Sequence, residues 1–126
     1  MQFDTDILIW IFRGDEAAAN VVEEEPERFI SVVTYMELVQ GSVNNRETKI
    51  IKSFLRDLSF GVVPLSENIG HRASIYMEEY GAASGLRVAD ALIAATAVEN
   101  SSALCTGDAR HFRAIRELRL SLFQHR

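Results

Sequence analysis

The chain has 126 residues, 48% of them hydrophobic and 25% charged, which is the composition of one ordinary globular domain over residues 1–126. No apolar run approaches the roughly 20 residues that span a bilayer, and no basic export signal precedes the acidic start, so we expect a cytoplasmic protein without a membrane segment. The single cysteine, Cys105, excludes an internal disulfide. The net charge of −5 argues against non-specific coating of nucleic acid, but it does not exclude a nuclease.

The first third of the sequence alternates between predicted strands and helices. Gly14 ends a strongly apolar helix, Asp15 is placed to cap the next one, and Pro26 interrupts the chain before a β-branched strand. Thr34 opens a short helix that stops at Gly41. In chain order the predicted elements are a strand at 1–4, helices at 6–13 and 15–24, a strand at 28–33 and a helix at 34–41.

The clearest periodicity in the chain lies at 45–58, which is predicted to be an amphipathic helix. Its apolar face carries Ile50, Ile51, Phe54, Leu55 and Leu58. Its opposite face, called the basic face below, carries Arg46, Lys49, Lys52 and Arg56. The remaining predicted elements are a strand at 61–65, a long helix capped by Ser66 and reaching about 83, a helix at 88–99, and strands at 103–106 and 118–123.

Repeated alternation of strands and helices predicts a three-layer α/β/α sandwich with a mainly parallel central sheet. Ligands of open parallel sheets bind beyond the carboxyl ends of the strands. We see no internal repeat or linker, so the whole chain is predicted to form one such domain.

Four acids lie at strand-to-helix junctions or in first helical turns, and hence at the carboxyl edge of that sheet: Asp4, Glu37, Asp90 and Asp108. Gathered carboxylates repel each other, by roughly 4 kcal/mol per pair at 4 Å and an effective dielectric constant near 20. Protons or divalent cations relieve that repulsion. The four acids therefore favour a Mg²⁺- or Mn²⁺-dependent reaction at a phosphate, and Thr5 and Thr106 add hydroxyls beside two of them.

Each acid also has a structural explanation. Asp4 can cap the following helix, Glu37 can close a capping box with Thr34, and Asp108 can cap a helical turn at 109–112. Asp90 is harder to explain in this way, because it heads a stripe of apolar and small residues that must face the sheet: Ile93, Ala94 and Ala97.

Four segments in this order resemble the PIN-domain ribonucleases, specifically the VapC-type toxins of bacterial toxin–antitoxin pairs. They are Asp4-Thr-Asp-Ile-Leu-Ile, Ser31-Val-Val-Thr-Tyr-Met-Glu-Leu38 followed by Gly41, Asp90-Ala-Leu-Ile-Ala-Ala-Thr-Ala97, and Leu104-Cys-Thr-Gly-Asp-Ala-Arg-His-Phe112. Each segment alone is short, but together they extend over nearly the whole chain.

The resemblance implies that the same four acids form the catalytic site, with Asp4 and Asp90 as direct ligands of Mg²⁺, or of Mn²⁺. It also implies RNA as the substrate, a homodimer, and inhibition by a cognate antitoxin. Two features depart from the family pattern. Only three residues precede Asp4, fewer than in the usual first strand, so that strand is truncated or frayed, and Asp6 stands where Asn or Ser is common.

Three other functions stay open at this point. Asp4-x-Asp6 resembles the start of haloacid dehalogenase-type phosphatases, although Leu8 stands where those enzymes have Thr or Val. A PIN-like binding module without catalysis and a nuclease that processes RNA or DNA outside a toxin pair are the others. No histidine is required for the metal-dependent reaction: His71 and His125 are predicted to be surface groups, and His111 to pack or to bind substrate.

The basic face is either solvated surface or a guide for the phosphate backbone of RNA. The grooves beside the short helix at 35–41 are predicted to receive an amphipathic antitoxin segment that carries Arg or Lys toward the acids.

Overall fold

The computed structural model describes residues 1–124 and contains a five-stranded parallel sheet in the order β3-β2-β1-β4-β5. The strands are β1 (Gln2–Phe3), β2 (Phe29–Ser31), β3 (Gly61–Val63), β4 (Leu104–Thr106) and β5 (Leu120–Leu122). The helices are α1 (Thr5–Phe12), α2 (Glu16–Glu24), α3 (Val32–Gln40), α4 (Asn45–Asp57), α5 (Glu67–Ser84) and α6 (Val88–Glu99).

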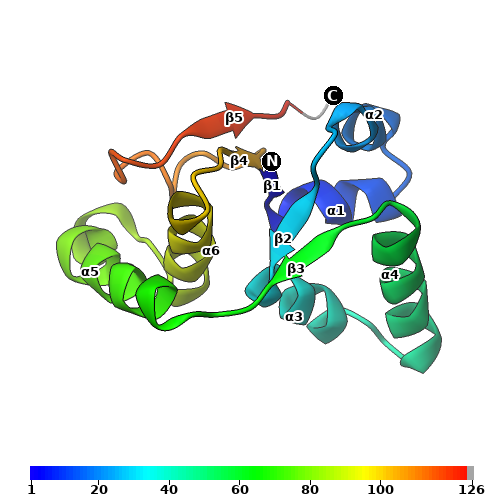
Figure 1. The fold of residues 1–126 in the computed structure, drawn as a ribbon, viewed down its shortest axis with the longest axis horizontal. Helices are drawn as coiled ribbons and strands as arrows, with labels where there is room; N and C mark the ends of the chain where they lie inside the picture. Colours follow the sequence, from blue (N-terminus) through cyan, green and yellow to red (C-terminus); the bar gives the residue numbers. More distant parts are fainter. Residues whose placement is uncertain (125–126) are drawn as a thin grey trace.

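Helices cover both faces of the sheet, as Figure 1 shows: α5 and α6 lie on one side, and α1, α2 and α4 lie on the other. Each side has its own apolar core. One core joins α5 and α6 to Leu104 and Phe112, and the other joins α1, α2 and α4 to Phe3 and Ile30. The predicted α/β/α sandwich with a parallel sheet is therefore confirmed.

The first strand is short but central. Its residue Gln2 pairs with Phe29 of β2 and Leu104 of β4, and Phe3 pairs with Cys105. Phe3 is fully buried, and the Cys105 thiol is buried as well. A two-residue strand with neighbours on both sides is not frayed, and it fixes the position of Asp4, the residue that follows it.

The predicted boundary between strand 28–33 and helix 34–41 was wrong. The Ser31 hydroxyl accepts a hydrogen bond from the Val33 amide at 3.0 Å and so caps a helix that already begins at Val32. The β-branched pair Val32-Val33 suggested a strand, but the cap and the burial of Val33 in the core favour the helix. Thr34 therefore lies inside α3, and the predicted capping box with Glu37 does not form.

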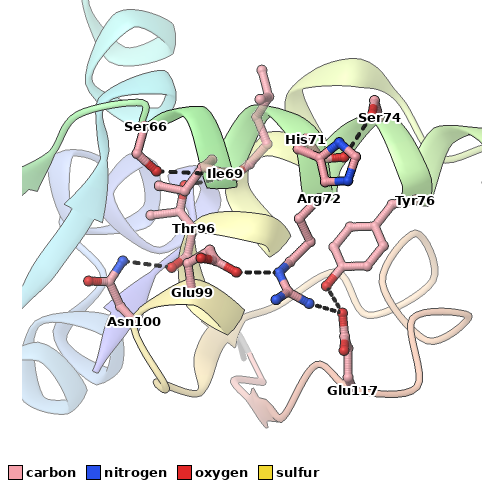
Figure 2. Close-up of polar contacts among 11 residues, drawn as sticks. Ser66, Ile69, His71, Arg72, Ser74, Tyr76, Thr96, Glu99, Asn100 and Glu117 are labelled. Atoms are coloured by element: carbon pink, nitrogen blue, oxygen red, sulfur yellow. Dashed lines mark hydrogen bonds and ion pairs between the residues drawn. The ribbon is translucent and has the colours of Figure 1, made fainter.

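A polar cluster joins the N-terminal half of α5 and the C-terminal end of α6 to the segment before β5 (Figure 2). Arg72 donates to Glu99 Oε2 at 2.5 Å and to Glu117 Oε1 at 2.7 Å, and the Tyr76 hydroxyl donates to the same Glu117 oxygen. These hydrogen bonds lower the pKa of Glu117. Residues 107–119 form a segment of turns that begins next to Asp108. The cluster holds the other end of this segment through Glu117.

His71 is exposed beside this cluster, as predicted, whereas His125 lies outside the described residues. Within residues 1–124 no helix combines the length and the apolar character that crossing a membrane requires.

Candidate functional site

Asp4 lies at the centre of the carboxyl edge, directly after β1. Its side chain accepts hydrogen bonds from the Thr5 amide at 2.8 Å and from the Thr106 hydroxyl at 2.7 Å, and the residue is only 8% exposed. Burial, together with the charges of Asp6 and Asp90, raises the pKa of Asp4 to about 7. Asp4 is both the N-cap of α1, as one interpretation had it, and a buried acid in a negative environment.

Glu37 reaches the same edge from α3. Its Oε1 accepts a hydrogen bond of 2.6 Å from the Thr5 hydroxyl, which also lies 3.0 Å from the Thr34 hydroxyl. The glutamate itself is exposed. Thr5 therefore joins the helix that follows β2 to the helix that follows β1, and it orients one carboxylate oxygen of Glu37.

Asp108 follows β4, and its amide donates to the Thr106 hydroxyl at 3.1 Å. Because that hydroxyl donates in turn to Asp4, Thr106 connects the two acids. The Asp108 carboxylate accepts from the Arg110 amide at 3.3 Å and lies 3.8 Å from His111 Nε2. Asp108 therefore closes a local turn, as predicted, and is half-buried at the rim of the site.

Asp90 lies in the first turn of α6, and its Oδ2 accepts a hydrogen bond of 3.3 Å from the Arg87 amide. Asp90 is half-buried, while Ile93, Ala94 and Ala97 on its stripe are at most 1% exposed, as predicted. Its negative charge contributes to the raised pKa of Asp4, so Asp90 lies close enough to act on that carboxylate.

Asp6 is a fifth acid at this edge, and it was not among the predicted site residues. Its Oδ2 accepts from the Gly107 amide at 2.9 Å, and its Oδ1 is buried without a hydrogen-bond partner among the described residues. Burial, with a further contribution from the Asp108 charge, raises the pKa of Asp6. The spacing Asp4-x-Asp6 at the start of one helix was the signal available in the sequence.

The carboxylates of Asp4 and Asp90 suit a hard divalent cation, because such a cation prefers oxygen ligands. Among residues 1–124, no three acidic, histidine or cysteine side chains come close enough together to hold an ion by themselves. Mg²⁺ commonly takes only one or two carboxylates and fills its other positions with water and substrate phosphates. Asp4 and Asp90, whose charges lie close enough to interact, would match that number.

A groove of about 500 Å³ begins at Glu37 and runs between α1, α3 and α4. Its apolar lining includes three exposed side chains, Ile9, Phe12 and Ile50, which are 36%, 39% and 52% exposed. Ile50 was predicted to belong to the buried face of its helix, whereas Ile51 and Leu55 fill that role. The groove places exposed apolar surface next to an acid of the candidate site.

The family model of the PIN domain matches residues 1–118. A chain of a toxin–antitoxin complex from Klebsiella pneumoniae is 30% identical, with a TM-score of 0.79 and 93% of each chain covered. VapBC2 from Rickettsia felis bound to a DNA fragment from its promoter has a chain at 19% identity and a TM-score of 0.80, with 98% of each chain covered. DNA-bound VapBC from Salmonella typhimurium has a chain at 22% identity and a TM-score of 0.79, with 95% of each chain covered.

No match was found among curated proteins. The family match nevertheless extends from β1 to the segment before β5, and so includes all four predicted acids and four of the five strands. The solved structures with the same fold include VapBC complexes, in agreement with the VapC-type resemblance. The chain belongs to the PIN-domain family.

Proposed function

We propose that this protein is a Mg²⁺- or Mn²⁺-dependent endoribonuclease that acts in the cytoplasm as the toxin of a toxin–antitoxin pair. The observation that carries the proposal is the environment of Asp4. This carboxyl group is almost fully buried, has Asp6 and Asp90 as charged neighbours, and has a pKa raised to about 7. A structure retains such a group most readily where a cation offsets the charge.

The residues divide into two groups by their place in the site. Asp4 and Asp90 would hold the cation, with Thr106 and the Thr5 amide fixing the orientation of Asp4. A divalent cation bound there would supply Lewis acidity, which activates water and offsets negative charge on the scissile phosphate. Glu37 and Asp108 lie at the rim. The Thr5 hydroxyl engages one oxygen of Glu37, and the other oxygen can accept a proton from the attacking water.

The groove beside Glu37 supports a protein partner. An amphipathic antitoxin helix could place apolar residues against Ile9, Phe12 and Ile50, and a Lys or Arg of that helix would then reach the candidate site at Glu37. An inhibitor bound in this way would block access of RNA and neutralise the acids. Homodimerisation, which the family resemblance implies, would bring two such sites into one particle.

RNA cleavage by the purified protein tests the proposal. Cleavage should require Mg²⁺ or Mn²⁺, stop with EDTA, and fall about a hundredfold or more in Asp4→Asn and Asp90→Asn, because each substitution removes a charge that holds the cation. Asp57→Asn is the matched control, since Asp57 is an exposed acid of α4 that pairs with Arg56.

Three results would contradict the proposal. Cleavage that persists in EDTA would exclude the metal-dependent reaction. Cleavage of DNA with RNA left intact would favour a DNA nuclease. A folded wild-type protein that binds RNA but never cleaves it would favour a non-catalytic binding module.

A further inference from the structure

The start of α1, with its cap Asp4, contacts the end of β4 and the turn that follows it at two points. Asp4 accepts from the Thr106 hydroxyl, and Asp6 Oδ2 accepts from the Gly107 amide at 2.9 Å. The residue after Gly107 is Asp108, so both contacts lie within two residues of a proposed catalytic acid. The contact between Asp6 and Gly107 joins positions 101 residues apart in the sequence, and it therefore has to be made by the fold.

Gly107 fits this contact because it has no side chain. A Cβ at this position would lie 2.9 Å from Asp6 Oδ2 and 3.4 Å from the Phe123 carbonyl oxygen. The first distance is shorter than carbon and oxygen tolerate without bonding, and the carboxylate is the more mobile of the two neighbours. An alanine at 107 would therefore displace Asp6 and lengthen the hydrogen bond to the amide.

We propose that Asp6 is a positioning residue, which holds the Gly107 amide and thereby sets Asp108 at a fixed place relative to Asp4. The role needs an oxygen acceptor at position 6 and a residue without a side chain at position 107. Its consequence for catalysis rests on the proposed ribonuclease function, whereas its consequence for the geometry of the turn does not.

Asparagine at position 6 separates this role from a role of the negative charge. An Asn side chain keeps one oxygen acceptor for the Gly107 amide, and its nitrogen would replace Oδ1, which has no partner among the described residues. Asp6→Asn and Asp6→Ala both remove the charge beside Asp4 and at the N-terminus of α1. Only Asp6→Ala removes the acceptor, so the asparagine variant is the matched control.

Amide hydrogen exchange at Gly107, read by NMR on the whole protein, tests the geometry. Exchange should accelerate about tenfold or more in Asp6→Ala, the scale expected for loss of a hydrogen bond to a charged group, and should stay within about threefold of wild type in Asp6→Asn. The Asp108 amide resonance should move in Asp6→Ala and much less in Asp6→Asn. Unchanged exchange at Gly107 in Asp6→Ala would overturn the proposal.

Turnover of RNA tests the consequence. We expect Asp6→Ala to lower kcat about tenfold or more with KM changed less than about twofold, and Asp6→Asn to restore most of kcat. Equal loss of kcat in the two variants would show that the charge matters and would overturn the positioning role. If wild type cleaves no RNA while the exchange results hold, the ribonuclease function fails and the positioning of Asp108 stands.

A double-mutant cycle gives a readout of the steric contact. Gly107→Ala should destabilise the wild-type protein more than it destabilises Asp6→Ala, because the shortened side chain leaves room for the new methyl group. Strict additivity of the two substitutions would contradict the contact between position 6 and position 107.

Discussion

Asp4 combines burial with a negative environment, and this has a measurable effect on stability. Because its pKa is raised from 3.8 to about 7, the native protein binds this proton more tightly than the unfolded chain does. Between about pH 4 and pH 7 unfolding therefore releases a proton, and the free energy of unfolding falls as the pH rises. Without metal the contribution lost across this window is on the order of 4 kcal/mol.

Asp4→Asn removes that titration. We predict that urea denaturation without divalent metal shows the variant gaining stability relative to wild type as the pH rises from about 4 to about 7, with the gain complete at pH 8. Titrating groups remote from Asp4 are common to both proteins and cancel in the difference. Two stability curves that run parallel over this pH range would show that Asp4 is not held in the environment described above.

If Asp90 binds the cation, its substitution should change how Mg²⁺ affects the melting temperature. We predict that Asp90→Asn melts at or above the wild-type temperature in EDTA, because one of the repelling charges is gone. Mg²⁺ should raise the melting temperature of wild type more than that of the variant, since a ligand stabilises the state that binds it. Thermal scans at several Mg²⁺ concentrations measure both effects, and equal shifts in the two proteins would exclude Asp90 as a ligand.

At the scale of single elements, α4 has two exposed surfaces of different character, one apolar and one basic. Its groove side presents Ile50, and its basic face is exposed at all four residues, Arg46, Lys49, Lys52 and Arg56. Arg56 already lies 3.5 Å from Asp57, which leaves the two lysines as the better test of RNA binding. In an acidic protein, such a face could attract the phosphate backbone and direct it toward the site.

Charge reversal on α4 tests that idea. We predict that Lys49→Glu with Lys52→Glu weakens RNA binding and reduces the slope of log Kd against log salt concentration by about one to two. The Mg²⁺-induced rise in melting temperature should stay the same. Arg116→Glu, a reversal at an exposed residue before β5, changes the net charge by half as much as the double variant and controls for a charge reversal outside α4. If the double variant binds RNA as tightly as wild type across a salt series, the basic face is solvated surface and does not bind RNA.

The elements also show where local sequence signals succeed. Asp15 and Ser66 cap α2 and α5 as predicted, because each side chain accepts an amide three residues ahead. The signal failed at Ser31-Val-Val, where strand propensity and a serine cap favour different structures. The local cap by Ser31 and the packing of Val33 decide the outcome, and the packing depends on the tertiary structure.

For the whole molecule, the order of strands and helices was enough to predict the α/β/α class, because alternation leaves few ways to cover a parallel sheet. It was also enough to place Asp4, Glu37, Asp90 and Asp108 at one edge. Grooves beside α3 were predicted, but their lining by residues of α1 and α4 was not. That lining and the contact between Asp6 and Gly107 could not be predicted, because they join residues distant in sequence whose approach is set by packing.

The most direct test of the central claim is to induce the protein in cells and map RNA ends, with Asp4→Asn induced in parallel at the same level. The ribonuclease proposal predicts new RNA ends at defined positions, together with growth arrest, for wild type only. New ends in equal number with Asp4→Asn, or growth arrest by wild type without any new RNA ends, would contradict it.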